Sequence, residues 1–371
     1  SGAAMKIAVI GGGSSYTPEL VSGLIERANT IGLETVSLHD LDRARLETVA
    51  GFCRRMAQAR DSRLKIETAA ELAPAIEHSD FVITQLRVGG NAARREDERL
   101  GRRHGLIGQE TTGVGGFAKA LRTIPALLRI AREMERLAPH AALVNFTNPS
   151  GLVTEALLKH SRVRAIGLCN IPITFQLELA RALSARREEL ELDYVGLNHL
   201  SWVRRVRLRG EDITDKVLAL NDAGRPANLP ELSYPRGFIR ALGMIPMHYL
   251  RYYYLTGRML EEQNRKEQTR ADEVMAIEQE LMKIYADPAR SQKPELLSRR
   301  GGAHYSQAAL ELVEALHFDR GELQIVNVMN QGAIPDLAAD SVVEVPCRVD
   351  KSGAHPLPLS LIHISEPTRP Y

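Results

Sequence analysis

The sequence has few cysteines, little net charge and no long apolar run. Cys53, Cys169 and Cys347 are the only cysteines among 371 residues, and no two are closely spaced, which predicts a reducing compartment without disulfides. The formal charge of +2 comes from 48 basic and 46 acidic residues, a balance that gives no sign of a nucleic-acid-binding face. No apolar run reaches membrane-spanning length, and the strand after Met5 is too short for a signal peptide. We therefore expect a cytoplasmic protein without nucleic-acid or membrane partners.

Neither end of the chain has a helical or strand pattern. Residues 1–4 resemble a tag remnant, and residues 361–371 follow a proline-rich stretch. We expect both to be non-native tails and leave them out of the fold prediction.

A glycine-rich turn between a strand and a helix dominates the first part of the chain. Apolar residues 7–10 predict a buried strand, Gly11, Gly12 and Gly13 form the turn, and a helix is expected from residue 17. Such a turn, here continued by Ser14 and Ser15, presents backbone N–H groups and a positive helix end to a phosphate. The pattern departs from G-x-G-x-x-G, because residue 16 is not glycine. The turn indicates a dinucleotide site or, alternatively, a turn that binds nothing.

A second strand, residues 35–40, ends in an acid. An acid there holds the adenosine ribose of a bound dinucleotide. Asp40 and Asp42 are both candidates, and one of them is expected to cap the helix that begins near Arg43.

Strands and helices alternate to about residue 185, which predicts an α/β fold with a doubly wound parallel sheet. We expect a Rossmann-like domain over residues 5–188 and an α+β domain over residues 189–360, the order found in lactate and malate dehydrogenases. Residues 193–203 are expected to be one strand. The helix over residues 118–137 is expected to be interrupted at Pro125, and the charged run at 94–99 is expected to be a solvated face.

Polar residues stand at the ends of several predicted strands. Asn148 follows one strand, Cys169 ends the next, and His199 lies within an apolar run. A thiolate and an imidazole brought together could hold a divalent metal. The alternatives are a small buried cysteine and a core histidine.

Five segments along the chain form a specific set. They are IGGGSSYTPEL (10–20), GQETTGVGG (108–116), VNFTNPSG (144–151), GLCN (167–170) and GLNHL (196–200). This set resembles glycoside hydrolase family four, the NAD- and metal-dependent glycosidases, and the resemblance runs from Met5 to about residue 346. Asn170 after Cys169 is similar to the 6-phospho-β-glucosidases of the family, whereas the α-specific members carry aspartate there. The resemblance implies further helices after about residue 353, which this chain lacks.

The resemblance implies hydrolysis of 6-phospho-β-glucosides through oxidation and elimination. NAD⁺ takes hydride from C3 of the sugar, and a divalent metal, typically Mn²⁺ in the family, polarises the resulting carbonyl. A tyrosinate removes the C2 proton, the aglycone leaves, water adds and NADH reduces C3 again. The cofactor is thereby regenerated in each turnover.

The resemblance also assigns roles to individual residues. Cys169 and His199 match the metal ligands. Tyr249 matches the base, although three neighbouring tyrosines make a core aromatic the alternative. Glu110 matches a catalytic glutamate in the second glycine-rich segment, where it is one candidate proton donor for the leaving group.

Four further residues match substrate-binding positions. Asn148 resembles a residue that holds sugar hydroxyls, and Asn170 replaces the acid that the α-specific members use. Arg94 and Arg270 match positions near the 6-phosphate, a group that the planar guanidinium binds in pairs of hydrogen bonds. The alternative is a surface ion pair, Arg94 with Glu96 or Arg270 with Asp272.

Three other functions remain open from the sequence. One is a family member acting on an α-linked sugar, a non-phosphorylated sugar or a uronide. The second is an NAD-dependent 2-hydroxy-acid dehydrogenase, and the third is an inactive dinucleotide-binding chain. The family resemblance further implies a homodimer or homotetramer.

Overall fold

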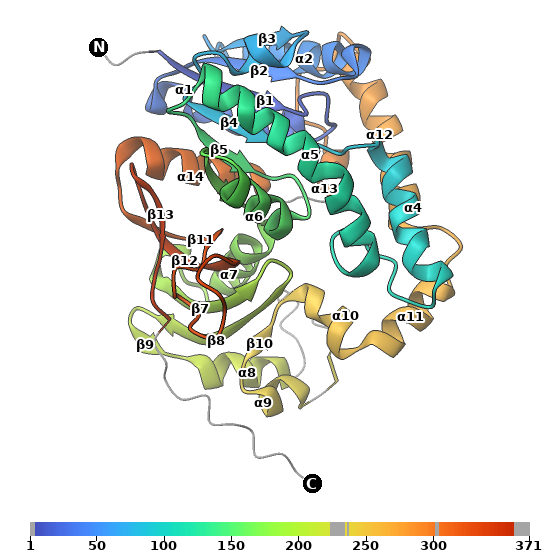
Figure 1. Cartoon of the computed structure of the whole chain (residues 1–371), viewed down its shortest axis with the longest axis vertical. Coiled ribbons are helices and arrows are strands. Elements are labelled where there is room, and N and C mark those ends of the chain that lie inside the picture. The colour runs from blue at the N-terminus through green and yellow to red at the C-terminus, as the bar shows by residue number, and fades with distance from the viewer. Residues whose placement is uncertain (1–3, 223–233, 236, 301–303, 360–371) are drawn as a thin grey trace.

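The computed structural model describes residues 4–222, 234–235, 237–300 and 304–359 (Figure 1). The two expected tails lie outside these residues apart from Ala4. None of the described helices is both long and apolar enough to cross a membrane.

The strands of the described residues form two sheets. They are β1 (Met5–Ile10), β2 (Leu33–His39), β3 (Lys65–Ala69), β4 (Phe81–Thr84), β5 (Ala142–Asn145), β6 (Arg164–Gly167), β7 (Leu190–Leu197), β8 (Leu200–Leu208), β9 (Glu211–Asp212), β10 (Ile245–Pro246), β11 (Glu322–Met329), β12 (Val342–Asp350) and β13 (Gly353–Pro356).

Helices connect and cover these strands. They are α1 (Thr17–Ile31), α2 (Arg43–Gln58), α3 (Leu72–Ile76), α4 (Gly90–Arg103), α5 (Gly113–Leu137), α6 (Ser150–His160), α7 (Asn170–Ala182), α8 (Thr214–Asp222), α9 (Phe238–Leu242), α10 (Arg251–Tyr254), α11 (Thr256–Asn264), α12 (Arg270–Ala286), α13 (Leu296–Arg299) and α14 (Tyr305–Phe318), with the 3₁₀ turns η1 (Arg187–Glu189) and η2 (His248–Leu250).

The large sheet has the order β13-β12-β11-β6-β5-β4-β1-β2-β3. Strands β1 to β6 are parallel, whereas β11, β12 and β13 add to the β6 edge in antiparallel pairs. The parallel part therefore has the Rossmann order 3-2-1-4-5-6, which confirms the predicted doubly wound sheet. The order reverses between β1 and β4, and ligands of such sheets bind outside the carboxyl ends of the strands at this point.

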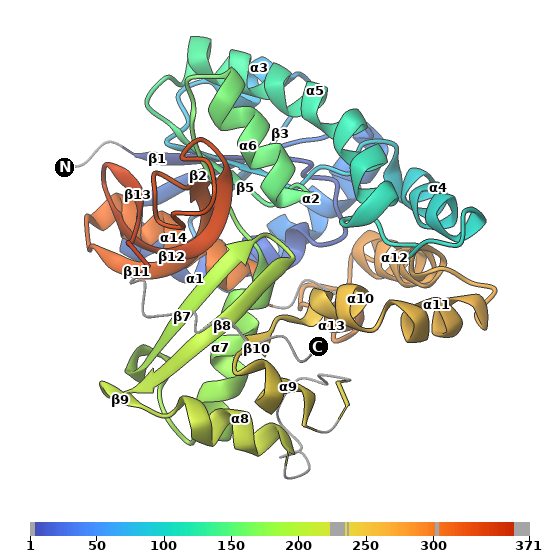
Figure 2. The ribbon, with the colours of Figure 1, turned by 60° about the horizontal axis from the view of Figure 1, so that its bottom comes forward.

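The small sheet has the order β10-β8-β7, with β9 paired to β8. The single strand expected over residues 193–203 is wrong: β7 and β8 form a hairpin that turns at Asn198 and His199. His199 has φ 66°, a left-handed conformation that costs energy for any residue but glycine and often occurs at functional sites. Figure 2 shows this hairpin in front of α7 and below the large sheet.

Two expectations about the helices are wrong. Helix α5 runs unbroken through Pro125, because its buried face continues on both sides of the proline, with Ala120 before it and Leu127 after it. The charged run at 94–99 belongs to α4 and is not simply a solvated face, because Asp97 and Glu98 are buried. Asp97 accepts two hydrogen bonds from Arg122, and such pairing is what permits a carboxylate to be buried.

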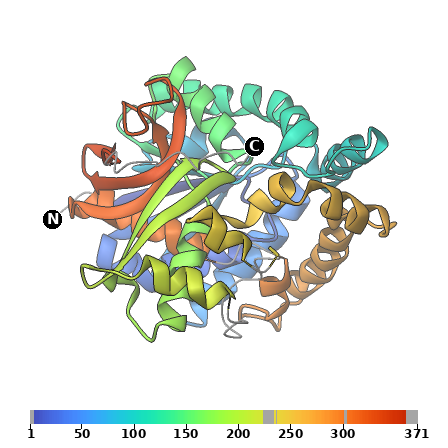
Figure 3. The same ribbon diagram turned by 90° about the horizontal axis from the view of Figure 1, so that it is seen from below.

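The late helices pack on the early ones. The ring of Phe52 in α2 stacks on Tyr285 in α12 at 4.6 Å, and a Cβ added to Gly23 in α1 would lie 2.4 Å from Leu310 of α14. One apolar core includes residues from both halves of the chain. Figure 3 shows α12 beside α4, with α10 and α11 extending from the small sheet toward them. The division into domains at residue 188 stays a prediction.

Candidate active site

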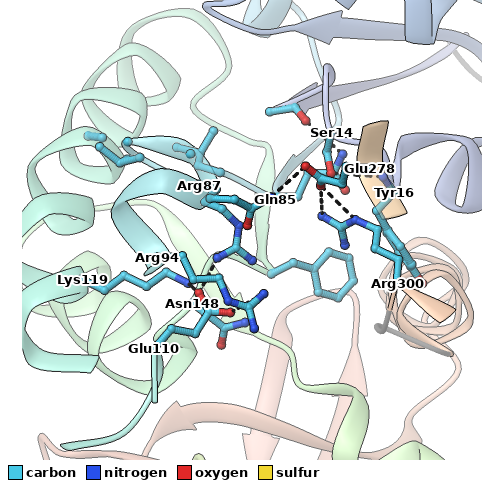
Figure 4. A pocket seen from close by; sticks show the side chains of 18 of the residues that line it. Ser14, Tyr16, Gln85, Arg87, Arg94, Glu110, Lys119, Asn148, Glu278 and Arg300 are labelled. Carbon is cyan, nitrogen blue, oxygen red and sulfur yellow. Dashed lines mark hydrogen bonds and ion pairs between the residues drawn. The ribbon is translucent and has the colours of Figure 1, made fainter. Parts of the chain in front are cut away.

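A cavity of about 1600 Å³ extends from the glycine-rich turn to Tyr249 and His248. It lies at the carboxyl ends of β1, β4 and β5, where the sheet topology predicts a ligand. Figure 4 shows two groups of polar and charged side chains along it. Ser14, Glu278 and Arg300 lie at one end, and Arg94, Glu110 and Lys119 lie at the other.

The glycine-rich turn requires small residues for steric reasons. Gly11 has φ 92°, and an added Cβ would lie 2.7 Å from the Gln85 carbonyl oxygen. A Cβ on Gly12 would meet Leu38, and one on Gly13 would meet the Asp40 carboxylate, each at 2.9 Å. Gly11 and Gly13 line the cavity, whereas Gly12 does not and instead packs against β2.

The expectation that the glycine N–H groups are free for a phosphate is wrong. Those of Gly11 and Gly12 donate to the His39 carbonyl, and that of Gly13 donates to Asp40 at 2.9 Å. The turn instead offers the cavity Ser14 and the positive end of α1, which favours an anion such as a pyrophosphate.

The two candidate acids after β2 have different places. Asp42 accepts a hydrogen bond from the Arg45 backbone N–H and caps α2. Both acids line the cavity, but Asp40 lies beside Gly13 in the glycine-rich turn, where an acid can accept from ribose hydroxyls. The residues at this end of the cavity fit a dinucleotide, because a turn that has room only for glycine lies next to an acid at the end of β2.

A buried carboxylate binds the glycine-rich turn to α12. Glu278 accepts hydrogen bonds from Ser15 at 2.7 Å, from Asn91 at 2.8 Å and from Arg300 at 3.1 Å, and Arg45 lies 3.2 Å away. Ser15 is fully buried and does not line the cavity. Its side chain therefore supports the turn from behind.

Cys169, His199 and Tyr249 come together from three parts of the chain. The Cys169 sulfur lies 3.5 Å from His199 Nε2, and the imidazole stacks on the Tyr249 ring with centroids 3.8 Å apart and planes 7° apart. Burial lowers the pKa of His199 to about 3, so the imidazole is neutral and its lone pair is available. Burial and the Glu344 charge raise the pKa of the Cys169 thiol, which a bound metal would deprotonate.

These two side chains fit a metal ion that leaves positions open for substrate. Two ligand atoms each about 2.0–2.3 Å from one metal lie roughly 3–3.6 Å apart, which matches the observed separation. His199 Nδ1 is buried and has no hydrogen-bond partner among the described residues. Within the described ranges no three His, Cys, Asp or Glu side chains gather as a complete metal site. A metal held by Cys169 and His199 would therefore need oxygen ligands from substrate or water.

Glu110 lies among three cations. Its carboxylate accepts from Arg87 and from Lys119 Nζ at 2.6 Å, and Arg94 lies 3.2 Å away. Burial would raise the pKa of Glu110, but the three positive charges outweigh it and hold that pKa well below its usual range. The carboxylate is therefore ionised, which does not suit the proton-donor role considered above. Burial also lowers the pKa of Lys119 to about 8, against the opposing effect of Glu110.

Tyr249 is a weak base in the protein alone. Burial, followed by the charges of Cys169, Tyr252 and Glu110, raises the pKa of its hydroxyl. A tyrosinate at neutral pH therefore requires an added positive charge nearby, such as a divalent cation beside His199.

The two arginines expected at the phosphate have different surroundings. Arg94 is buried and pairs with Glu98 and Glu110, not with Glu96. Arg270 has a side chain that is 47% exposed and pairs with Glu273, not with Asp272. Both line the cavity, so the surface-pair alternative is wrong for Arg94 and names the wrong partner for Arg270.

The two asparagines also line the cavity. Asn148 follows β5, and its Oδ1 accepts from the Ser150 N–H at 3.3 Å. Asn170 is the first residue of α7, next to Cys169. Each asparagine follows a parallel strand of the large sheet, Asn148 after β5 and Asn170 after β6, and its amide can bond to hydroxyl groups of a ligand in the cavity.

Sequence reasoning did not single out Arg87, Lys119, Glu278 or Arg300, although all four line the cavity. Arg87 carried a usable signal, because it follows β4 at the edge where ligands bind. Lys119 lies in α5, Glu278 lies in α12 and Arg300 follows α13. Only folding of the chain brings these three residues to the site.

Comparisons with known proteins agree along the whole chain. The model described as Family 4 glycosyl hydrolase matches residues 6–185, and that of the Family 4 glycosyl hydrolase C-terminal domain matches residues 194–365. A probable 6-phospho-beta-glucosidase of Bacillus subtilis (strain 168) is 41% identical over 97% of this chain and 84% of its own length.

Solved structures give the same result. A Thermotoga maritima 6-phospho-beta glucosidase, crystallised with manganese, NAD+ and glucose-6-phosphate, has TM-score 0.89 and 41% identity, covering 95% of this chain and 83% of its own. Malate dehydrogenase from Plasmodium falciparum, at TM-score 0.58 and 12% identity over 95% of this chain and 90% of its own, shares the fold alone. This likeness confirms the predicted dehydrogenase-like arrangement. The chain belongs to family 4 of the glycosyl hydrolases.

Proposed function

We propose that the protein hydrolyses 6-phospho-β-glucosides with NAD⁺ and a divalent metal, preferably Mn²⁺. The observation that carries this proposal is the contact of Cys169 with His199 and of His199 with Tyr249; Tyr249 lines the cavity that also contains the glycine-rich turn. A site for a dinucleotide accounts for the oxidation of C3 of the sugar. A thiol–imidazole pair that can hold a metal, next to a tyrosine, accounts for the removal of the C2 proton beside the C3 carbonyl. The relatives named 6-phospho-β-glucosidase at 41% identity support the substrate class.

The bound cofactors would supply a hydride acceptor for C3 of the sugar and a cation that polarises the C3 carbonyl. The protein residues provide position and proton transfer. Tyr249 takes the C2 proton, and the flat stack on His199 holds its ring in one orientation. Asn148 and Asn170 orient sugar hydroxyls, and Asp40 accepts from the ribose of the dinucleotide.

Glu110 acts through the groups around it. Its ionised carboxylate holds Arg87, Arg94 and Lys119 at one end of the cavity, and its negative charge makes Tyr249 a stronger base. The leaving group would then take its proton from water, or would leave without one.

Arg94 and Arg270 would bind the 6-phosphate from two sides. Arg94 is oriented by Glu98 and Glu110 before substrate arrives, whereas Arg270 donates to the exposed Glu273 and to the Arg299 carbonyl. A preorganised and an adaptable guanidinium together suit a doubly charged group at the cavity wall.

We also propose a homodimer or homotetramer, as the family resemblance implies, which light scattering would measure. A reducing, cytoplasmic location fits the three cysteines, which are free and buried, because Cys169 has to stay reduced to bind a metal.

Release of nitrophenol from nitrophenyl 6-phospho-β-glucoside tests the function. The reaction contains NAD⁺, Mn²⁺ and a thiol reductant, and each is omitted in turn. We expect turnover only with both cofactors and without net NADH. Accumulation of NADH would favour a 2-hydroxy-acid dehydrogenase. Turnover of the α-anomer or of the unphosphorylated glucoside instead would favour another substrate of the family. NAD⁺ binding without any turnover would indicate an inactive chain.

A further inference from the structure

The two proposed metal ligands come from different sheets. Cys169 follows β6 of the large sheet, and His199 lies at the β7–β8 turn of the small sheet. Their ligand atoms lie 3.5 Å apart. A shift of the hairpin by one ångström would spoil that separation, so some contact has to fix one sheet against the other.

Glu344 makes that contact. It lies on β12 and is 1% exposed. Its Oε1 accepts from Asn198 Nδ2 at 3.0 Å and from Asn327 Nδ2 at 3.1 Å, and its Oε2 accepts from the Tyr194 hydroxyl at 2.8 Å. Tyr194 and Asn198 both belong to the hairpin, but Asn198 adjoins His199 at the turn, whereas Tyr194 lies within β7. The bond to Asn198 is therefore the one that fixes the position of His199.

The other side of the network leads to Cys169. Asn327 on β11 pairs with Gly167 on β6, and its amide lies 3.4 Å from the Gly167 carbonyl oxygen. Gly167 is two residues before Cys169. The side chain of Asn198 also hydrogen-bonds the Cys169 thiol. Glu344 is thus linked through Asn198 to the turn that carries His199, and through Asn327 to the end of β6, which precedes Cys169.

The hairpin turn needs such an anchor. His199 has φ 66°, and a strained residue of this kind persists only when its surroundings hold it. Asn198, its neighbour, is held by Glu344. Without that bond the turn could relax and His199 Nε2 would move away from the sulfur.

Burial raises the pKa of the Glu344 carboxyl group, and the hydrogen bonds from Tyr194, Asn198 and Asn327 oppose this effect. Three donors surround it, but no cationic partner is found among the described residues. Burial of a carboxylate without a cation is costly in a protein interior. The charge of the ionised carboxylate raises the pKa of the Cys169 thiol. The same charge would attract a divalent cation bound at Cys169.

We infer that Glu344 is a positioning residue that sets the separation of Cys169 and His199 through Asn198 and Asn327, and thereby the affinity for the metal. This inference rests on the metal site of the proposed function. Groups that orient metal ligands typically change metal affinity by about 10–100-fold when they are replaced.

The test is Mn²⁺ affinity in the absence of NAD⁺ and substrate, measured from the electron paramagnetic resonance signal of free Mn²⁺. We expect Glu344→Gln and Asn198→Ala each to weaken binding by about 10–100-fold. The double variant should be no weaker than the more damaged single variant, because both changes break one link. NAD⁺ binding should remain at the wild-type level in all three.

Tyr194→Phe is the matched control. It removes a hydrogen bond to the same carboxylate and leaves the Asn198 and Asn327 links in place, so it should lower stability but change Mn²⁺ affinity by less than about threefold. If Glu344→Gln does not fold, Asn198→Ala gives the answer alone. Cys169→Ser identifies the site of binding.

The outcomes separate the two ideas. If wild type binds Mn²⁺ and Cys169→Ser abolishes binding, but Glu344→Gln and Asn198→Ala bind as wild type, the positioning role is wrong and the metal site stands. An equal loss in Tyr194→Phe would also overturn the positioning role. If wild type does not bind Mn²⁺, or Cys169→Ser binds it unchanged, the metal site is wrong and the role of Glu344 is wrong with it.

Discussion

Glu110 links the charge of the cavity to the basicity of Tyr249. Its negative charge is one cause of the raised pKa of Tyr249. The three cations beside it would lower that pKa once the carboxylate is removed. A base must be deprotonated to act, so the rate rises with pH through the pKa of Tyr249.

For Glu110→Gln we therefore expect the rising limb of kcat/KM against pH to move to lower pH. Loss of a negative charge lowers the pKa of Tyr249, and the weaker base should also reduce the maximum rate. Glu133→Gln is the control, because Glu133 also lines the cavity but does not contribute to the pKa of Tyr249. A limb that stays in place, or that moves to higher pH, would contradict this role of Glu110.

The two phosphate arginines should respond differently to truncation. Arg270→Ala should raise KM for the phosphorylated substrate by about 10–100-fold, because a charge-assisted hydrogen bond contributes about 1.5–3 kcal/mol. Its exposed side chain should leave the free energy of unfolding within about 0.5 kcal/mol. Arg94→Ala should also cost roughly 3–5 kcal/mol of stability, since it removes the cation paired with the buried Glu98 and one of the three cations around Glu110.

The measurements are Michaelis kinetics and urea unfolding of both variants. Arg265→Ala is the matched control, an exposed arginine paired with Glu261 that does not line the cavity. Equal KM values for wild type and Arg270→Ala would remove Arg270 from the phosphate site.

At the scale of elements, α12 carries much of the cavity wall. Its first turn contains Arg270, its middle contains Glu278, and both line the cavity. The helix begins with a capping box, in which Thr269 Oγ1 accepts from the Asp272 N–H at 3.3 Å and Asp272 accepts from the Thr269 N–H at 2.8 Å. The cap satisfies N–H groups that would otherwise be unpaired.

Thr269→Ala should lower the free energy of unfolding by about 1 kcal/mol, within the range of roughly 0.5–2 kcal/mol for lost caps. Urea unfolding measures it as a lower midpoint with an unchanged m-value. Thr48→Ala is the control, because the Thr48 hydroxyl only bonds back to the Ala44 carbonyl within α2; its effect should stay within about 0.5 kcal/mol. An effect no larger at Thr269 would mean that the box contributes nothing to α12.

Local patterns were enough to predict several elements. The strand, turn and helix around Gly11 follow from neighbouring residues, and so does the alternation that predicts the parallel sheet. The β7–β8 turn was missed because Asn198 and His199 lack the glycine that marks a tight hairpin. The start of α5 at Gly113 was missed because glycine is a poor helix former.

The site was predicted from motifs and not from geometry. Spacing alone did not decide between a metal pair and two core residues at Cys169 and His199, since they are thirty residues apart and meet only through the contact of two sheets. Glu278 gave no local signal, because its partners Ser15 and Arg45 belong to a distant part of the chain. Lys119 pairs with Glu110 at a spacing that no local pattern marks.

At the scale of the whole molecule, the large sheet crosses the predicted domain boundary. Strands β11, β12 and β13 extend the sheet that begins with β1, and α12 and α14 pack on α2 and α1. Removal of the second half would expose Phe52 and the α1 face that meets Leu310. Exposure of apolar area costs about 25 cal/mol per Å², a large loss for a protein of ordinary stability.

Residues 5–188 alone should therefore not unfold cooperatively and should bind a dye that reports exposed apolar surface. The whole chain should unfold in one transition, in which the fluorescence of Trp202, the single tryptophan, changes together with the far-UV circular dichroism. Trp202 lies on β8 of the small sheet, whereas most of the helical signal comes from elsewhere, so coincident curves mean that both sheets unfold together. A cooperative transition of the fragment near that of the whole chain would show that the first domain is independent and that the contacts with α12 and α14 add little to its stability.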